Sequence, residues 1–350
     1  MPISRVAAVA ALLAWSAGAP AQADKAEGAS AARALGPVFQ ADMPTALERL
    51  AALPDGALTD RQRQMRDCIV ARFAGPSPAA ALDSLPAPAG DVLAAYRRYW
   101  TASLMRTATP ERAEARLSAD LAPFAGSDAH DLEAREAGAA RAIEAQGLFV
   151  LGGVTPPLQE FMLWRKQSAA VQTVVLPGGS VDVRVTLLDD FVSYGWAAWG
   201  TCDAAHTGGW ATAEGGIMVV APSWDLASES YRISLLAHES QHFSDYRRYP
   251  KLAAPDLEYR AKLVELMLAH DTQRSLLEKF SAEAARNRAT PHPFASWWLI
   301  ERLRGRLGGD PMAADLSGDA VRQAAAAEFQ AHSAVLDAKG PVTVETALPD

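Results

Sequence analysis

The chain has 350 residues, of which 49% are hydrophobic and 21% charged, with a formal net charge of −8 and two cysteines. A wholly disordered chain would have fewer apolar residues and a more extreme charge, and a small disulfide scaffold would need more cysteines. Because nucleic-acid binding requires a basic face, we expect no nucleic acid among the partners. The length permits one large domain or two of ordinary size.

The first 23 residues have the pattern of a secretory signal peptide. Arg5 supplies a positive charge, residues 6–15 form an apolar run, and a small-residue triplet ends at Ala23, where we expect cleavage. The apolar run is shorter than the roughly 20 residues that cross a bilayer. No later stretch is long and apolar enough to span a membrane. We therefore predict a periplasmic or secreted protein without a membrane span in the mature chain.

Export changes the meaning of the two cysteines, Cys68 and Cys202. In an oxidising compartment, two cysteines can form a disulfide, which here would join the N-terminal half to the middle of the chain. The alternative is two separate buried thiols, which behave as small apolar groups. We favour the bridge, and no signature of a cysteine enzyme surrounds either residue.

Residues 24–147 are predicted to form a helical N-terminal region without a chemical motif. Its first part, residues 24–36, is rich in Ala, Gly and Ser and is interpreted as a loose leader. Further on, segments such as 91–100 and 129–146 place apolar residues at the three- and four-residue spacing of an amphipathic helix. We interpret this region as a scaffold or a lobe that shapes a substrate site.

Strands are predicted in the middle of the chain. Residues 148–151 form a short apolar run, and residues 171–176 and 181–188 flank the turn sequence Pro-Gly-Gly-Ser at 177–180, which favours a hairpin. A further strand is expected at 216–221, after a segment dense in Gly and Trp.

The pattern becomes helical again after Pro222. Ser223 or Asp225 can cap a helix that continues to about Arg248 and is stopped before Pro250. Three further helices are predicted at about 255–287, 291–304 and 318–338. The last residues, 341–350, are expected to be an unstructured tail.

The first of these helices contains the sequence His238-Glu239-Ser240-Gln241-His242. Two histidines four residues apart lie on one face of a helix and can both reach one Zn²⁺ ion. Glu239 can take the proton of a metal-bound water and deliver it to the leaving group. The apolar residues around the motif favour a buried active-site helix over a surface helix with two incidental histidines.

This motif resembles that of the zincin metallopeptidases. The resemblance covers roughly residues 180–285 and implies that His238 and His242 bind zinc and that Glu239 is the general base. It also implies an α+β fold for residues 148–340, in which a small mixed sheet packs on the motif helix. The strand near 216–221 is then expected at the edge of that sheet, where an extended peptide could pair with it.

The third zinc ligand separates the branches of the zincins. The metzincin branch needs Gly and then His or Asp at the positions that Asp245 and Arg248 occupy, so it does not fit. The gluzincin branch takes a Glu from a following helix. Glu258 is the first candidate, because Ala261 one turn later would permit close helix packing, and Glu265 is the second. Either carboxylate could instead be a solvated helix charge.

One position departs from the thermolysin-like pattern, which has an Asp four residues after the glutamate ligand. Lys262 occupies that position, so a minimal gluzincin is the closer analogy. Asp245 could supply the carboxylate that orients a zinc-bound histidine, or it could be only a charge near a helix end.

A zinc hydrolase also needs a donor for the developing oxyanion. The candidates are His206, Tyr231, Tyr246 and Tyr259, with His206 and Tyr246 carried forward as possible catalytic residues. The remaining histidines are interpreted as structural or solvated: His130, His270, His292 and His332.

These features together predict an exported zinc-dependent hydrolase, with a peptide or protein as substrate and Zn²⁺ as cofactor. Two other readings remain open at this point. One is a catalytically inactive zincin-like binding or scaffold protein, although binding alone would not need Glu239. The other is a metal-free helical interaction protein in which the motif is a coincidence. The sequence does not indicate an oligomeric state.

Overall fold

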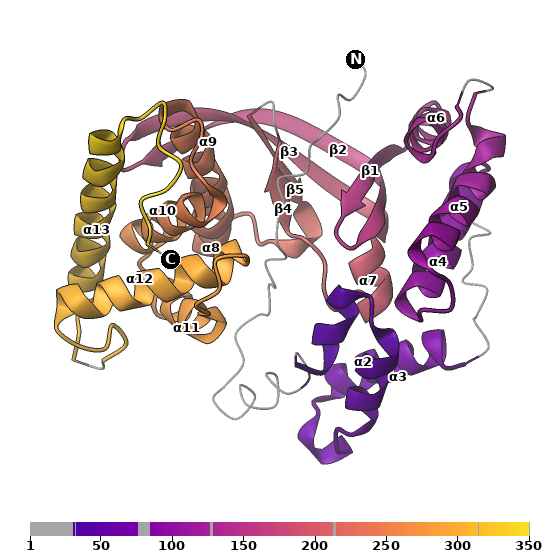
Figure 1. Cartoon of the computed structure of the whole chain (residues 1–350), viewed down its shortest axis with the longest axis horizontal. Helices are drawn as coiled ribbons and strands as arrows, with labels where there is room; N and C mark the ends of the chain where they lie inside the picture. The colour runs from indigo at the N-terminus through magenta and orange to yellow at the C-terminus, as the bar shows by residue number, and fades with distance from the viewer. Residues whose placement is uncertain are drawn as a thin grey trace. The chain divides into compact units, whose positions relative to one another are not determined.

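The computed structural model describes residues 31–349 except 32, 76–84, 127–128, 213–214 and 314. The predicted signal peptide therefore lies outside the described residues, as does the first part of the leader. Helices dominate the described chain, and a five-stranded mixed sheet completes it, which confirms the predicted α+β class (Figure 1). None of the described helices has the length and apolar character needed to cross a membrane.

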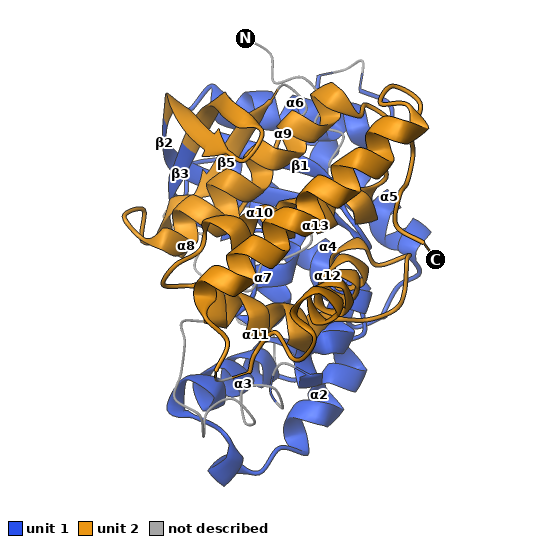
Figure 2. Cartoon of the chain, turned by 90° about the vertical axis from the view of Figure 1, so that its left-hand side faces the viewer, with its two compact units in different colours: residues 1–168, 187–208 blue, residues 169–186, 209–350 orange. Residues whose placement is uncertain are grey.

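The chain divides into two compact units. The first contains residues 1–168 and 187–208, and the second contains residues 169–186 and 209–350 (Figure 2). The division thus differs from a simple boundary at residue 147. The first strand and parts of the next two belong with the N-terminal helices.

Helices make up most of the first unit. They are α2 (Met43–Ala51), α3 (Asp60–Phe73), α4 (Ala89–Leu104), α5 (Pro110–Leu121), α6 (Leu132–Glu144) and α7 (Trp196–Thr201). Local capping defines several of them, because Asp42, Thr59, Thr109 and Asp131 each accept a hydrogen bond from the first turn that follows. A 3₁₀ turn, Gly36–Gln40, begins at the last residue of the segment expected to be a loose leader, residues 24–36.

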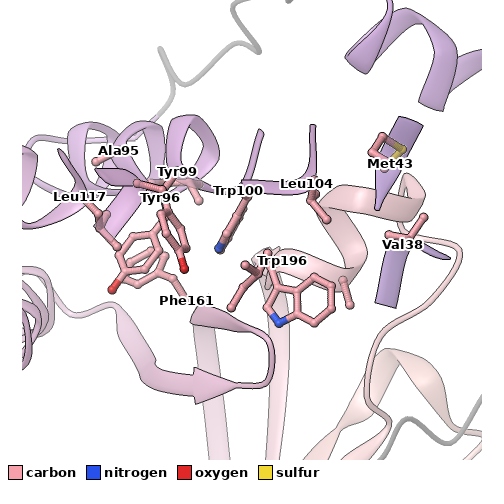
Figure 3. Packing of buried hydrophobic residues seen from close by; sticks show 14 of the residues in the cluster. Val38, Met43, Ala95, Tyr96, Tyr99, Trp100, Leu104, Leu117, Phe161 and Trp196 are labelled. Atoms are coloured by element: carbon pink, nitrogen blue, oxygen red, sulfur yellow. The ribbon is translucent and has the colours of Figure 1, made fainter. Parts of the chain in front are cut away.

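Aromatic side chains form the centre of the first unit's core (Figure 3). The rings of Tyr96 and Phe161 stack with their centroids 4.5 Å apart. Trp100 and Trp196 are each 1% exposed, and their indole nitrogens donate to the backbone carbonyls of Gln159 and Thr155. Helices α4 and α7 are thereby joined to the strands by apolar contact and by satisfied polar groups.

A buried carboxylate lies beside this core. Glu160 Oε1 accepts hydrogen bonds from the backbone N–H groups of Phe161 and Trp196, each at 3.0 Å. Gly195 has a positive φ of 96°, and a Cβ at this position would overlap the Glu160 carboxylate. The glycine therefore permits the approach that places Glu160 at the start of α7.

The predicted disulfide is present in the structure. Cys68 of α3 is bonded to Cys202, which directly follows α7. The two cysteines are 134 residues apart in the sequence. Both cysteines belong to the first unit. The bond therefore joins two distant parts of the same unit.

The five strands form one sheet in the order β1-β2-β3-β5-β4. Their bounds are β1 (Phe149–Thr155), β2 (Leu158–Leu176), β3 (Gly179–Tyr194), β4 (Gly209–Ala211) and β5 (Gly216–Val220). β1 pairs antiparallel with the first part of β2, with Phe149 opposite Trp164. The hairpin predicted around residues 177–180 is present, with longer strands than the apolar pattern alone indicated.

The edge of the sheet differs from the prediction. β5, the strand expected at the edge, lies between β3 and β4. The three-residue strand β4 pairs antiparallel with it, with Trp210 opposite Met218, and forms the edge itself. This short strand in the Gly- and Trp-rich segment before β5 was not predicted, because three residues are too few to show an alternation of apolar and polar side chains.

The second unit has four long helices besides the one that carries the motif. They are α10 (Ala254–Leu268), α11 (Gln273–Glu283), α12 (Pro291–Leu307) and α13 (Gly318–Lys339). Helix α10 packs against α9, α12 and α13 (Figure 1). The single helix expected over 255–287 is thus two helices, separated at residues 269–272.

The motif helix begins later than predicted and contains an irregular turn. Ser228 is its cap and accepts from the backbone N–H of Tyr231. Ser223 ends a short 3₁₀ helix before it, and Asp225 lies in irregular backbone between the two. A short α8 (Glu229–Tyr231) leads into a π-helical segment, Arg232–Ala237, and then into α9 (His238–Arg248). The π-helical segment ends at the residue before the motif, as such turns often do near functional sites.

The tail is more ordered than expected. Val344 and Leu348 are buried, and the backbone N–H groups of Ala347 and Leu348 donate to Oδ1 of Asp256 in α10 at 2.7 and 2.9 Å. Asp256 is fully buried and also lies 3.1 Å from Nε2 of His332 in α13. The polar tail sequence gave no sign of these contacts because the anchoring carboxylate is about 90 residues earlier.

Candidate metal centre

Three of the predicted ligands lie together in the second unit. One ligand atom from each of His238, His242 and Glu258 lies within 4.8 Å of the others. The Nε2 atoms of the two histidines are 3.3 Å and 3.5 Å from the two oxygens of the Glu258 carboxylate. The imidazole rings are nearly perpendicular, with centroids 4.8 Å apart. Both histidines are less than 10% exposed, so the motif does not lie on a surface helix.

Glu265 contacts the opposite nitrogen of His238. Its Oε1 atom lies 2.7 Å from Nδ1, at hydrogen-bond distance. Because an ionised carboxylate only accepts hydrogen bonds, Nδ1 carries a proton, and the neutral form of His238 that a metal requires therefore has its lone pair at Nε2. This is the arrangement in which a carboxylate behind a histidine fixes the tautomer of a metal ligand. Of the two candidate glutamates, Glu258 faces both Nε2 atoms and Glu265 lies behind His238.

Helix packing places both acids. Glu258 and Glu265 are seven residues apart, so they lie two turns apart on nearly the same face of α10. That helix packs directly against α9. Glu258 thus meets the His238–His242 face, while Glu265 meets the other side of the His238 ring.

Electrostatic coupling in this cluster is strong. Burial alone would lower the pKa of His238, but the Glu258 and Glu265 carboxylates outweigh it and raise the pKa to about 10. Burial would raise the pKa of Glu258, yet His292, His242 and His238 hold it well below its usual range. The cluster therefore contains an ionised carboxylate that only the surrounding imidazoles stabilise.

Asp245, one of whose two predicted roles was to orient a zinc-bound histidine, contacts Arg260. Its carboxylate is paired with Arg260 of α10, whose Nε donates to Oδ1 at 2.9 Å, and both side chains are buried. Asp245 lies three residues beyond His242, and its ion pair is with the guanidinium of Arg260, two residues after Glu258 on α10. The carboxylate that contacts the Nδ1 side of His238 is that of Glu265.

The side chains predicted as oxyanion donors have different surroundings in the structure. His206 belongs to the first unit, where its ring stacks on Tyr194. The hydroxyl of Tyr259 donates to Glu328 at 3.1 Å, and Tyr231 packs against Trp224.

Tyr246 is the remaining oxyanion candidate in the second unit. It is 38% exposed and lies one turn after His242 on α9. Partial burial is the main cause that raises the pKa of its hydroxyl, and the charges of Glu258 and Glu239 raise this pKa further.

His292 is a residue of this cluster that the sequence analysis missed. Its Nδ1 atom lies 2.9 Å from Oε2 of Glu258. It follows Pro291 in the first turn of α12, 34 residues after Glu258, and no spacing rule connects the two positions. The structure gives His332 the structural role expected of it, because it contacts the buried Asp256.

The residues present fit a zinc ion. Two imidazole nitrogens and a carboxylate oxygen are a common zinc donor set that leaves a position for water. Burying them together without a cation concentrates polar atoms of which some lack hydrogen-bond partners, among them Nδ1 of His242 and Oε2 of Glu258. His238, His242 and Glu258 are thus the residues that would hold the metal.

Comparison with known proteins gives no further assignment: no family model, curated protein or solved structure matches the chain.

Proposed function

We propose that the chain is an exported zinc hydrolase that cleaves peptide bonds. The observation that carries this proposal is the convergence of His238, His242 and Glu258 within 4.8 Å on two packed helices. A bound zinc ion would supply Lewis acidity and lower the pKa of a bound water. The disulfide in the first unit is consistent with export, because such bonds persist in oxidising compartments.

The chain's own residues have distinct roles in this proposal. Glu239 follows the first ligand on the motif helix and is only partly buried, so its carboxylate can accept a proton from water and return it to the leaving amine. Tyr246, one turn after His242, is the residue that would donate a hydrogen bond to the developing oxyanion. Glu265 holds the Nδ1 proton of His238 and thereby keeps Nε2 available as a ligand.

The sheet supports a peptide as the substrate. Strand β4 belongs to the same unit as the metal cluster and forms an edge of the sheet. A Cβ at Gly209 of this strand would approach the Leu235 side chain to 3.1 Å, so glycine permits β4 to pack against the π-helical segment before the motif. An extended peptide can add to such an edge by main-chain hydrogen bonds.

The test combines metal analysis with hydrolysis. Purified protein should contain about one zinc per chain and should cleave an unfolded protein substrate such as reduced casein. Glu239→Gln should retain zinc but lose at least 100-fold in kcat, because general base catalysis typically contributes 10²–10⁴-fold. Glu301→Gln, on the exposed side of α12, is the matched control and should retain activity. The proposal fails if no zinc is bound or if Glu239→Gln hydrolyses at the wild-type rate.

A further inference from the structure

His292 approaches the metal cluster from a third helix. It lies in the first turn of α12, and its Nδ1 atom is 2.9 Å from Oε2 of Glu258. Its ring is nearly parallel to that of His238, with centroids 6.3 Å apart and an interplanar angle of 11°. The side chain is 23% exposed, so most of it lies inside the second unit.

The Oε2 atom of Glu258 has few possible partners. It is inaccessible to solvent and lacks a well-directed hydrogen bond. The ring nitrogens at ion-pair distance from it are Nε2 of His238 at 3.3 Å and Nδ1 of His292 at 2.9 Å. A carboxylate oxygen that is buried without a donor carries a substantial desolvation penalty.

Metal binding removes one of these two partners. Since Nδ1 of His238 carries the proton that Glu265 accepts, Nε2 offers a lone pair to the metal and no N–H to Glu258. When Nε2 of His242 binds the metal, that nitrogen likewise has no N–H to donate to Glu258. His292 is then the neighbouring imidazole that can still donate to the Glu258 oxygen that is not bound to metal.

We propose that His292 is a positioning residue for the third metal ligand: its Nδ1–H donates to Oε2 of Glu258 and fixes the orientation of that carboxylate. The proposal rests on the metal site of the proposed function. It gives Glu258 an outer partner of the kind that Glu265 provides for His238. Such outer contacts commonly change metal affinity 10- to 100-fold.

Buried polar contacts hold His292 in place relative to Glu258. Lys262 of α10 is paired with Glu283 at the end of α11, and the same Glu283 oxygen accepts a hydrogen bond from Ser296 of α12. Ser296 is one helical turn after His292 and is fully buried. These contacts connect α10 to the first turns of α12, so the short distance between Glu258 and His292 is supported by both helices.

The experiment measures zinc affinity in the full chain by competition with a chromophoric chelator at fixed pH. His292→Ala should weaken zinc binding about 10- to 100-fold. His292→Asn should recover most of the loss, because its amide nitrogen can occupy the position of Nδ1. His292→Gln should not, since its longer side chain places the donor near the position of Nε2. His270→Ala, on an exposed loop residue of the same unit, should bind zinc like the wild type.

Thermal unfolding of the zinc-free variants shows whether they are folded, and the comparison of Asn with Gln decides the question even if the Ala variant fails to fold. Wild-type affinity in His292→Ala, or equal affinities in the Asn and Gln variants, would overturn the proposal. A wild-type protein that binds zinc but hydrolyses nothing contradicts the peptidase proposal and leaves the positioning role supported by the affinity series. A wild-type protein that binds no zinc overturns both.

Discussion

Nδ1 of His238 and Oε1 of Glu265 are 2.7 Å apart inside the second unit, and this contact determines which histidine nitrogen faces Glu258. We expect Glu265→Ala to weaken zinc binding about 10- to 100-fold, because His238 loses the acceptor that fixes its tautomer. Glu265→Gln should remain closer to the wild type, since its amide oxygen still accepts from Nδ1. Chelator competition measures both variants. Unchanged affinity in Glu265→Ala would show that the contact does not orient a ligand.

The buried pair between Asp245 and Arg260 makes a prediction about stability. Replacing Arg260 by Met leaves the Asp245 carboxylate buried without its main partner, and we expect the free energy of unfolding to fall by about 3–5 kcal/mol. The double variant Asp245→Leu/Arg260→Met should recover much of that loss, because no unpaired charge remains. Denaturant titration of the wild type, both single variants and the double variant gives the coupling. Additive losses would contradict the prediction.

Glu160 predicts a pH dependence in the first unit. Burial raises its pKa from 4.5 to about 7, although hydrogen bonds from Trp196 and Phe161 oppose this. The folded state therefore favours the protonated form. Its stabilisation is complete below pH 4.5 and is lost as the pH rises through 7, by about 3 kcal/mol in total. The free energy of unfolding should accordingly be lower at pH 8 than at pH 5.

Glu160→Gln separates this effect from that of Glu136, whose pKa burial also raises to about 7. The glutamine keeps the acceptor oxygen but has no charge, so we expect it to be more stable than the wild type at pH 8 and to show a smaller pH dependence. Glu136 should maintain a residual slope of the same sign. Urea titrations followed by tryptophan fluorescence at both pH values measure the difference. An equal slope in wild type and variant would exclude Glu160 as its source.

The disulfide predicts that the two units respond differently to reduction. The bond between Cys68 and Cys202 closes a loop of 134 residues, and its loss should destabilise the first unit by about 2–5 kcal/mol. The proposed zinc ligands all belong to the second unit, so zinc binding should be retained after treatment with a phosphine reductant, which does not compete strongly for the metal. Differential scanning calorimetry and zinc titration of the reduced protein check both parts. The double variant Cys68→Ala/Cys202→Ala should behave like the reduced chain.

Periodicity and local turn signals predicted much of the fold. The hairpin around residues 177–180 and the last two helices follow from alternation, from Pro-Gly turns and from three- and four-residue spacing, which are local properties. The break between α10 and α11 is different. Glu229 accepts from the backbone N–H of His270 and of Thr272, so a residue about 40 positions earlier stabilises that break.

Only the part of the candidate site that depends on local sequence or on the family resemblance was predictable. The pair His238 and His242 follows from one turn of helix. The choice of Glu258 came from the resemblance to the gluzincins and from Ala261 one turn later. The function of Glu265 depends on which side of the His238 ring α10 approaches, and that of His292 depends on how α12 packs against α10. Both are consequences of tertiary packing, for which a single sequence carries no periodic signal.

The π-helical segment, Arg232–Ala237, fixes the rotation of the motif relative to the start of its helix. Each residue of a regular helix turns the following side chains by about 100°, so removing one residue from this segment would direct His238 and His242 away from Glu258. Substitutions that preserve the length of this segment should be tolerated far better than a single deletion. The number of residues between Ser228 and His238 therefore determines whether the two histidines can face Glu258, in addition to the identity of the three residues.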